Sequence, residues 1–202
     1  MPATNFPKPD RLYKYTSIDS ANLILSTKTL KFSKPRDFND PFDCDVSLLD
    51  FEIKGNINEH VAIEIEKIKK QFSDRAEFHN LSSQKGFWEE LYRRSQISKV
   101  ESSRICCFSL SNDVVLMWSH YSNKHTGVCL EFDNKIQNRF LGLNEEADIS
   151  EGVVGYAAHE RINYMEEDRL IGTYKLFFNK SESWSHENEY RPVSYTHLRA
   201  HE

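Results

Sequence analysis

Apolar residues recur every three or four positions in five stretches of the chain, which is the spacing of an amphipathic helix. The clearest stretch runs from Ile57 to Phe72, with Asn56 or Asn58 as its N-cap candidate. The other predicted helices are a short one capped by Ser17 or Asp19, one marked by Phe87 and Leu91 and capped near Ser82 or Ser83, one over residues 116–121, and one over residues 165–178.

Short apolar or alternating runs predict strands between these helices. The run over residues 127–132 alternates most clearly, and the others lie at residues 11–16, 30–33, 105–110 and 153–156, with a last strand beginning near Glu189. Strands and helices are mixed without βαβ regularity, and no internal repeat divides the chain. The pattern therefore predicts one α+β domain over residues 11–192, with a small, mostly antiparallel sheet, flanking helices and an N-terminal arm over residues 1–10.

Residues 193–202 have the sequence of a translated sequencing adapter. They match, residue for residue, the in-frame translation of a transposon-end adapter used in library preparation. We therefore treat this segment as a non-native tail and leave it out of the fold prediction. It follows that we expect the natural domain to be truncated at its C-terminus.

Composition narrows the class of protein. The 202 residues fit one domain, and 39% apolar residues with 12% aromatic residues are enough to build a core. A net charge of −5 argues against general nucleic-acid binding, and no apolar run approaches the roughly 20 residues of a membrane span. We expect a cytoplasmic protein without membrane association, while the oligomeric state stays open.

Cysteine and histidine positions do not predict a metal site. The four cysteines form no CxxC pair, and zinc would require four convergent nitrogen or sulfur ligands. Buried free thiols are the expected state, and apolar flanks would raise the pKa of Cys106 and Cys107.

The first candidate site is the turn Asn39-Asp40-Pro41, which is flanked by phenylalanines that would anchor it to a core. Proline fixes its own φ and moves the preceding residue out of the helical region. The turn would hold Asn39, Asp40 and Asp43 in fixed positions. These side chains either orient a ribose, a phosphate-bound metal or a substrate, or they bond to nearby backbone amides of the turn.

Aromatic and basic residues supply two further candidates. Lys14 and Tyr15 either face a ligand from the first strand, or the tyrosine packs in the core while the lysine is solvated. Trp118 and Tyr121 either stack on a base or nicotinamide ring or belong to the core. His120 lies between them in sequence, on another helical face, and could transfer a proton.

The most chemically suggestive cluster lies near the end of the chain. Glu187 and Glu189 would share one face if both lie on the last strand, because side chains alternate along a strand. Two close carboxylates can split their pKa values and provide an acid or base near neutrality. The alternative is a surface ion-pair cluster with Arg191.

These motifs, in this order, resemble a bacterial family known as domain of unknown function 2971. The features that carry the resemblance over residues 11–191 are Leu12-Tyr13-Lys14-Tyr15, the run from Leu30 to Asp43, Cys107-Phe108-Ser109, Met117-Trp118-Ser119-His120-Tyr121, residues 125–132, and Lys180 with Trp184, Glu187, Glu189, Tyr190 and Arg191. The family name specifies no activity.

A more distant likeness concerns the ADP-ribosyltransferase fold. Those enzymes hold a dinucleotide with histidine or arginine on the first strand, where this chain has Lys14, and use a late glutamate, here Glu187 or Glu189. Lysine lacks the planar fork of arginine. The likeness implies a nucleotide-handling or NAD-consuming enzyme in a toxin or phage-defence setting. The alternatives are a non-catalytic ligand-binding or sensor module with the same cleft, or a scaffold whose aromatic residues are core.

Overall fold

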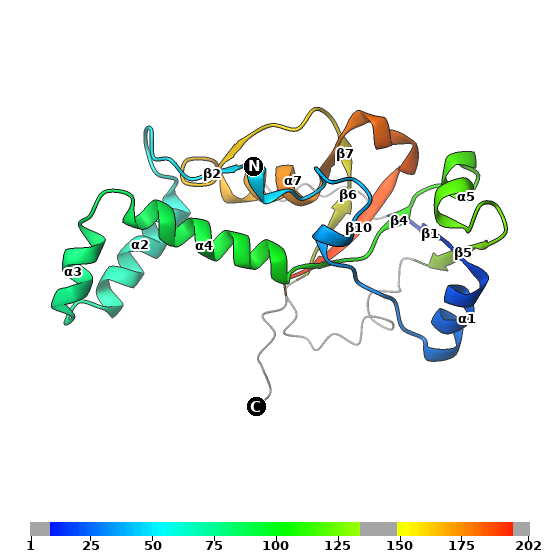
Figure 1. Cartoon of the computed structure of the whole chain (residues 1–202), viewed down its shortest axis with the longest axis horizontal. Helices are drawn as coiled ribbons and strands as arrows, with labels where there is room; N and C mark the ends of the chain where they lie inside the picture. Colours follow the sequence, from blue (N-terminus) through cyan, green and yellow to red (C-terminus); the bar gives the residue numbers. More distant parts are fainter. Residues whose placement is uncertain (1–8, 134–148, 196–202) are drawn as a thin grey trace.

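The computed structural model describes residues 9–133 and 149–195 as an α+β domain, as the sequence predicts (Figure 1). Of the predicted arm over residues 1–10 and the predicted tail over residues 193–202, only residues 9–10 and 193–195 lie within these ranges. Val193 and Ser194 are buried at the end of the last strand, Glu189–Ser194, so in the structure the domain extends two residues beyond the predicted bound at 192. Helices α2, α3 and α4 extend to one side, and the main sheet occupies the other side together with α1 and α5. The functional candidates all lie on the sheet side.

The main sheet is antiparallel, and strand β10 lies inside it. The strand order is β3-β10-β4-β1-β5, and β6 pairs with β10 on the other side. The bounds are β1 Arg11–Thr16, β3 Arg104–Ile105, β4 Phe108–Ser109, β5 Val128–Asp133, β6 Ile149–Val153 and β10 Glu189–Ser194. Two small parallel pairs join β2 (Leu49–Asp50) to β8 (Ile162–Asn163) and β7 (Gly155–Tyr156) to β9 (Asn179–Lys180).

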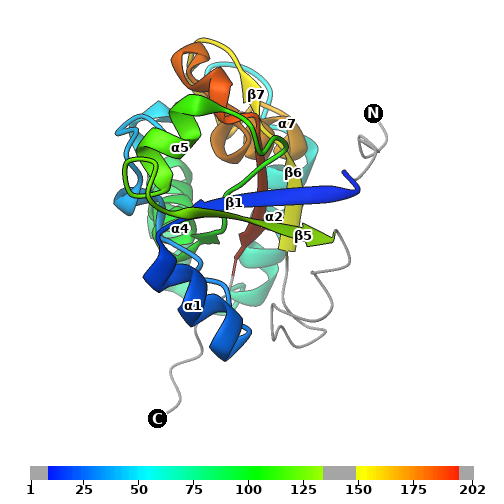
Figure 2. The ribbon, with the colours of Figure 1, turned by 90° about the vertical axis from the view of Figure 1, so that its right-hand side faces the viewer.

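Strands β1 and β5 pair along six residues, from Arg11 opposite Asp133 to Thr16 opposite Val128. Figure 2 shows them side by side, with α5 and α1 on opposite sides of the pair. Leu12 and Phe132 face each other in this register, and both are buried in a core cluster with Phe108. The alternating patterns of both strands are confirmed, because their apolar side chains reach this core.

The predicted strand over residues 105–110 is interrupted, which corrects the sequence interpretation. Cys106 and Cys107 separate β3 from β4, and both short strands pair with β10. The Cys106 amide donates to the carbonyl of Pro192 at 3.1 Å. Because proline has no N–H to return, the ladder cannot continue regularly beside it.

Within residues 9–133 and 149–195, five helices follow the predicted patterns, and one is not expected from the sequence. The bounds are α1 Ile18–Thr27, α2 Glu59–Gln71, α3 Ala76–Ser82, α4 Phe87–Ser102, α5 Val115–Tyr121 and α7 Arg169–Phe177. Ser17 caps α1, as predicted, by accepting from the Ser20 amide. The cap predicted for α4 at Ser82 or Ser83 is wrong, because these residues end the unexpected α3 and Gly86 occupies the N-cap position of α4.

In the part of the chain that the structure describes, shorter 3-10 turns connect the elements: η1 Pro35–Asp37, η2 Val46–Leu48 and η4 Glu182–Glu187. The predicted strand over residues 30–33 is reduced to a single bridge between Ser33 and Ile105. The predicted strand at residues 153–156 is split between β6 and β7, and α7 starts at Arg169 because Asp168 caps it.

Replacing Asn58 by alanine tests how the helical arm, formed by α2, α3 and α4, is attached to the rest of the domain. Its side chain caps α2 by accepting from the Val61 amide at 2.9 Å, and its Nδ2 donates to the carbonyls of Tyr164, Met165 and Glu167. We expect Asn58→Ala to lower the free energy of unfolding by about 1–2 kcal/mol, measured by urea unfolding. Asn80→Ala, an exposed change on α3, is the control, and equal effects of the two variants would contradict this cap's role.

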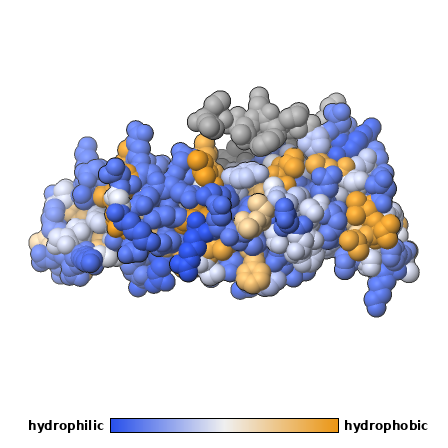
Figure 3. All heavy atoms as spheres, turned by 90° about the horizontal axis from the view of Figure 1, so that it is seen from above, coloured by the Kyte–Doolittle hydropathy of each residue, from blue (hydrophilic) through white to orange (hydrophobic). Residues whose placement is uncertain are grey.

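The surface differs between the two ends of the molecule. Figure 3 shows a mostly hydrophilic face over the helical arm and apolar residues gathered toward the opposite end. Val115 and Leu116 on α5 are among the exposed apolar residues. None of the helices in the described ranges is long and apolar enough to cross a membrane.

Candidate functional site

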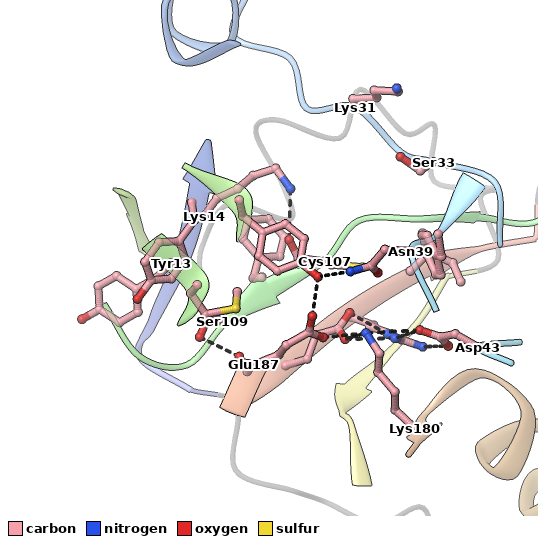
Figure 4. Close-up of a pocket in the computed structure, with 18 of the residues that line it drawn as sticks. Tyr13, Lys14, Lys31, Ser33, Asn39, Asp43, Cys107, Ser109, Lys180 and Glu187 are labelled. Carbon is pink, nitrogen blue, oxygen red and sulfur yellow. Dashed lines mark hydrogen bonds and ion pairs between the residues drawn. The ribbon is translucent and has the colours of Figure 1, made fainter. Parts of the chain in front are cut away.

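A pocket of about 270 Å³ lies where the sheet, α5 and the segment before η1 meet (Figure 4). Strands β1, β4 and β10 provide one part of the wall, and residues 31–43 provide another. The lining residues that matter for the chemistry are Tyr13, Lys14, Tyr15, Lys31, Ser33, Phe38, Asn39, Asp43, Cys107, Phe108, Ser109, Tyr121, Lys180, Glu187, Glu189 and Arg191.

Arg191 is the centre of a buried ion network at the inner end of the pocket. Its side chain is 0% exposed and forms two bonds to the Asp43 carboxylate, at 2.7 and 2.5 Å. It forms two more to Glu189, at 2.7 and 2.9 Å, and one to the carbonyl of Phe177 at 3.0 Å. The guanidinium therefore joins the Asn-Asp-Pro turn to β10 across 148 positions of sequence.

The network keeps Glu189 ionised. Burial by itself would raise the pKa of Glu189, but Arg191 and then Lys180 outweigh burial and lower that pKa to about 2. Burial likewise lowers the pKa of Arg191, but Glu189 and Asp43 raise it well above its ordinary value. Glu189 is thus a permanent counter-ion at neutral pH, and no proton is available on it for acid catalysis.

Glu187 occupies a different position from Glu189. Tyr121 donates its hydroxyl hydrogen to Oε1 of Glu187, and Lys180 donates to Oε2 at 2.5 Å. Asn39 donates in turn to the Tyr121 hydroxyl at 2.7 Å. The Ser109 hydroxyl donates a hydrogen bond to the backbone carbonyl of Glu187 at 2.8 Å. Glu187 is buried against these groups but borders the pocket, so its orientation is fixed by three separate parts of the chain.

Lys180 and Tyr121 both remain hydrogen donors at neutral pH. Burial lowers the pKa of Lys180, but Glu189, Glu187 and Asp43 together raise it above its ordinary value. Burial raises the pKa of Tyr121, and the neighbouring Glu187 raises it further. Both donors therefore keep their protons while they hold the Glu187 carboxylate.

The predicted strand carrying both glutamates is wrong in detail. Glu187 ends the 3-10 turn η4, Asn188 adopts a left-handed conformation with φ of 42°, and Glu189 begins β10. The turn at Asn188, rather than strand alternation, brings the two carboxylates to one pocket. The alternative of an ion-pair cluster with Arg191 is partly right, because the ion pairs exist but are buried instead of lying at the surface.

Strand β1 contributes Lys14 and Tyr15 to the pocket, as predicted. The Lys14 ammonium is already bonded to the carbonyl of Cys107 at 3.0 Å and lies 5.4 Å from the centre of the Phe108 ring. Tyr15 donates to the carbonyl of Ser111 at 2.9 Å. Lys14 is half-buried rather than freely solvated, and Tyr15 combines a core position with an edge on the pocket.

Three predicted site residues lie outside the pocket lining. Asp40 is buried in its turn, and its Oδ1 accepts from the Phe42 amide at 3.0 Å, as the turn-chemistry alternative predicts. Trp118 packs edge-on against Tyr15 and donates to the carbonyl of Asn112. His120 is exposed, as its helical position predicts, and faces His186 with ring centres 6.4 Å apart.

The pocket also contains residues that sequence reasoning left out of the site. Among them are Lys180, Lys31, Ser33, Cys107 and Ser109, all of which lie in segments that carry the family resemblance. A lysine after a helix normally projects into solvent, so nothing local marks Lys180 as buried. In the structure its ammonium group lies over the ring of Trp184, 4.8 Å from the ring centre.

The described residues do not combine into a metal centre. No group of three or more histidine, cysteine, aspartate or glutamate side chains within the described ranges is arranged to hold an ion. All four cysteines are free, and burial raises the pKa of Cys106 and Cys107 above the ordinary value for a thiol. These thiols stay protonated near neutral pH and are poor nucleophiles.

Comparison with known proteins adds one match. Residues 117–192 match the family model described as "Protein of unknown function (DUF2971)". The resemblance to this family is therefore confirmed over that segment, which contains Tyr121, Lys180, Glu187, Glu189 and Arg191. No curated protein matches the chain, and no solved structure does. The resemblance inferred for earlier residues, including Lys14 and Asn39, stays a prediction.

Proposed function

We propose that this pocket handles a nucleotide, in an enzyme of ADP-ribosyltransferase type that uses NAD as its co-substrate. The observation that carries the proposal is Glu187, a carboxylate bordering a pocket and oriented by two donors, Tyr121 and Lys180. Aromatic rings of Tyr13, Phe38 and Phe108 line the same pocket and offer surfaces for a base. A cytoplasmic setting in a bacterial toxin or phage-defence system is part of this proposal.

In the proposed reaction Glu187 is the catalytic carboxylate. The glycosidic C–N bond breaks, nicotinamide leaves with the bonding electrons, and the acceptor forms a new bond to the anomeric carbon. Glu187 accepts the proton that the acceptor loses. Glu189 has a positioning role, because both of its oxygens bind Arg191. Tyr121 and Lys180 then hold Glu187 in place.

The experiment is an assay of nicotinamide release from NAD with the Glu187→Gln and Glu189→Gln variants. We expect Glu187→Gln to lower the rate at least 100-fold, within the range for loss of a general base. Glu182→Gln, an exposed change on the same 3-10 turn η4, is the matched control and should keep the rate. A folded Glu187→Gln variant that retains the full rate would overturn the mechanism.

One observation supports a second candidate, a non-catalytic ligand-binding or sensor module. Both oxygens of Glu187 and both of Glu189 already accept hydrogen bonds from protein groups. A carboxylate held in this way can shape a pocket without transferring a proton. This alternative predicts that ADP-ribose binds without turnover. Glu187→Gln would then change the affinity for ADP-ribose, and neither the wild-type chain nor the variant would release nicotinamide from NAD.

A further inference from the structure

We infer that Lys31 and Ser33 form the anion subsite of the pocket, which takes the phosphate groups of a nucleoside diphosphate. This inference rests on the proposed nucleotide-handling function and deepens it. It assigns phosphate recognition to the segment before η1, in place of Lys14 on β1.

The local conformation places both side chains on the pocket. Ser33 forms two backbone hydrogen bonds with Ile105, N–H to O and O to N–H, each of 2.9 Å. This bridge fixes an extended segment whose side chains alternate. Phe32 packs against the core cluster that contains Leu12 and Phe108, while Lys31 and Ser33 line the pocket.

The side chain of Lys31 is available to a ligand. It is exposed, and no hydrogen bond or ion pair joins its ammonium group to any residue of the described ranges. All three of its hydrogens are therefore free for an anion. Lys14 lies in the same pocket, but it already donates to the carbonyl of Cys107 at 3.0 Å and lies near the sulfur of Cys106.

Charge is distributed unevenly along the pocket. Figure 4 shows Lys31 and Ser33 at one end, and Glu187 and Lys180 at the other. The buried end holds three carboxylates, Asp43, Glu187 and Glu189, against two cations, Lys180 and Arg191. Asp37 also lines the pocket, but it is paired with Arg36 at 3.9 Å. The surplus of one carboxylate at the buried end opposes phosphate there, so the phosphates belong at the Lys31 end and the hydroxyl groups of the ligand belong at Glu187.

The test compares charged and neutral probes. Binding of inorganic pyrophosphate, ADP and adenosine is measured by calorimetry at fixed ionic strength, for the wild-type chain and for the variants Lys31→Ala, Lys14→Ala and Lys67→Ala. Lys67 lies exposed on α2 and controls for the lost charge alone. We expect Lys31→Ala to weaken pyrophosphate and ADP at least tenfold, to leave adenosine unchanged, and to exceed the effect of Lys67→Ala.

Equal effects of Lys31→Ala and Lys67→Ala, or a larger loss in a folded Lys14→Ala variant, would overturn the subsite. Failure of the wild-type chain to bind both pyrophosphate and ADP would overturn it as well. Lys31-dependent binding without nicotinamide release would support the subsite while rejecting the enzymatic function. Nicotinamide release with an unchanged KM in Lys31→Ala would do the reverse.

Discussion

Replacing Arg191 by methionine is expected to lower the free energy of unfolding by about 3–5 kcal/mol, because the change leaves buried carboxylates without their main counter-ion. Asp43 and Glu189 each receive two hydrogen bonds from this guanidinium, and all three side chains are almost completely buried. Lys180 remains nearby, but at 3.5 Å from Asp43 and 3.7 Å from Glu189 it cannot replace the lost bonds. Urea unfolding followed by circular dichroism measures the loss.

Arg11→Met provides the matched control for this change. Arg11 forms an exposed ion pair with Glu131 at 3.1 Å, so the same substitution should cost at most about 1 kcal/mol. If Arg191→Met and Arg11→Met lose similar amounts of unfolding free energy, the buried network stabilises the fold no more than an exposed ion pair does.

The effect of Arg191→Met should also depend on pH. The folded-state pKa of Glu189 is lowered to about 2 from an ordinary 4.5, so its ionised form stabilises the wild-type fold above pH 4.5. That contribution disappears as the pH falls from about 4.5 toward 2. In the Arg191→Met variant no guanidinium lies beside Glu189 to lower this pKa. The difference between wild type and variant should therefore shrink over this window, and unfolding at pH 7 and pH 3 measures it.

Replacing Gly127 by alanine is the second change with a large expected effect. A Cβ at this position would lie 2.2 Å from the carbonyl oxygen of Thr16 and 2.7 Å from that of Ser122. Both neighbours are backbone atoms at the junction of β1, α5 and β5, so neither can move like a flexible side chain. We expect a loss of about 3 kcal/mol in unfolding free energy, at the upper end for overpacking.

Gly152→Ala is the control for Gly127→Ala. Its added Cβ would meet only the ring of Phe178, at 3.5 Å, which is an ordinary contact. We expect this variant to stay within about 1 kcal/mol of wild type. If Gly127→Ala unfolds at the same urea concentration as Gly152→Ala, the backbone at Gly127 does not lie as close to the carbonyl oxygens of Thr16 and Ser122 as the structure has it.

Local patterns predicted much of the fold, because many elements bury the face that their sequence shows. Strand β5 alternates in sequence and buries Phe132. Helix α2 repeats apolar residues and buries Val61 and Ile65, behind the N-cap that Asn58 supplies. Helix α3 escaped prediction because it is short and buries none of its residues, so its apolar positions carry little periodic signal.

The candidate site was predicted less completely, because its contacts join distant segments. The turn at Asp43 and the cluster at Arg191 were each visible in sequence, but nothing local pairs them. The alternating pattern places Lys31 in a strand, but its place at the pocket depends on the single bridge between Ser33 and Ile105. Ranking Glu187 above Glu189 required knowing which carboxylate Arg191 binds.

Strand β10 lies inside the sheet although it comes late in the chain, with β6 on one side and β3 and β4 on the other. During synthesis on a ribosome, strands β1, β4 and β5 emerge first and leave an edge of β4 unpaired. The carboxylate of Asp43 also has no bond to Arg191 until that residue is synthesised, 148 positions later in the chain. The pairing of β4 with β10 and the ion pair at Asp43 can therefore form only after translation has passed Arg191, and until then the free edge of β4 is open to pairing with other chains.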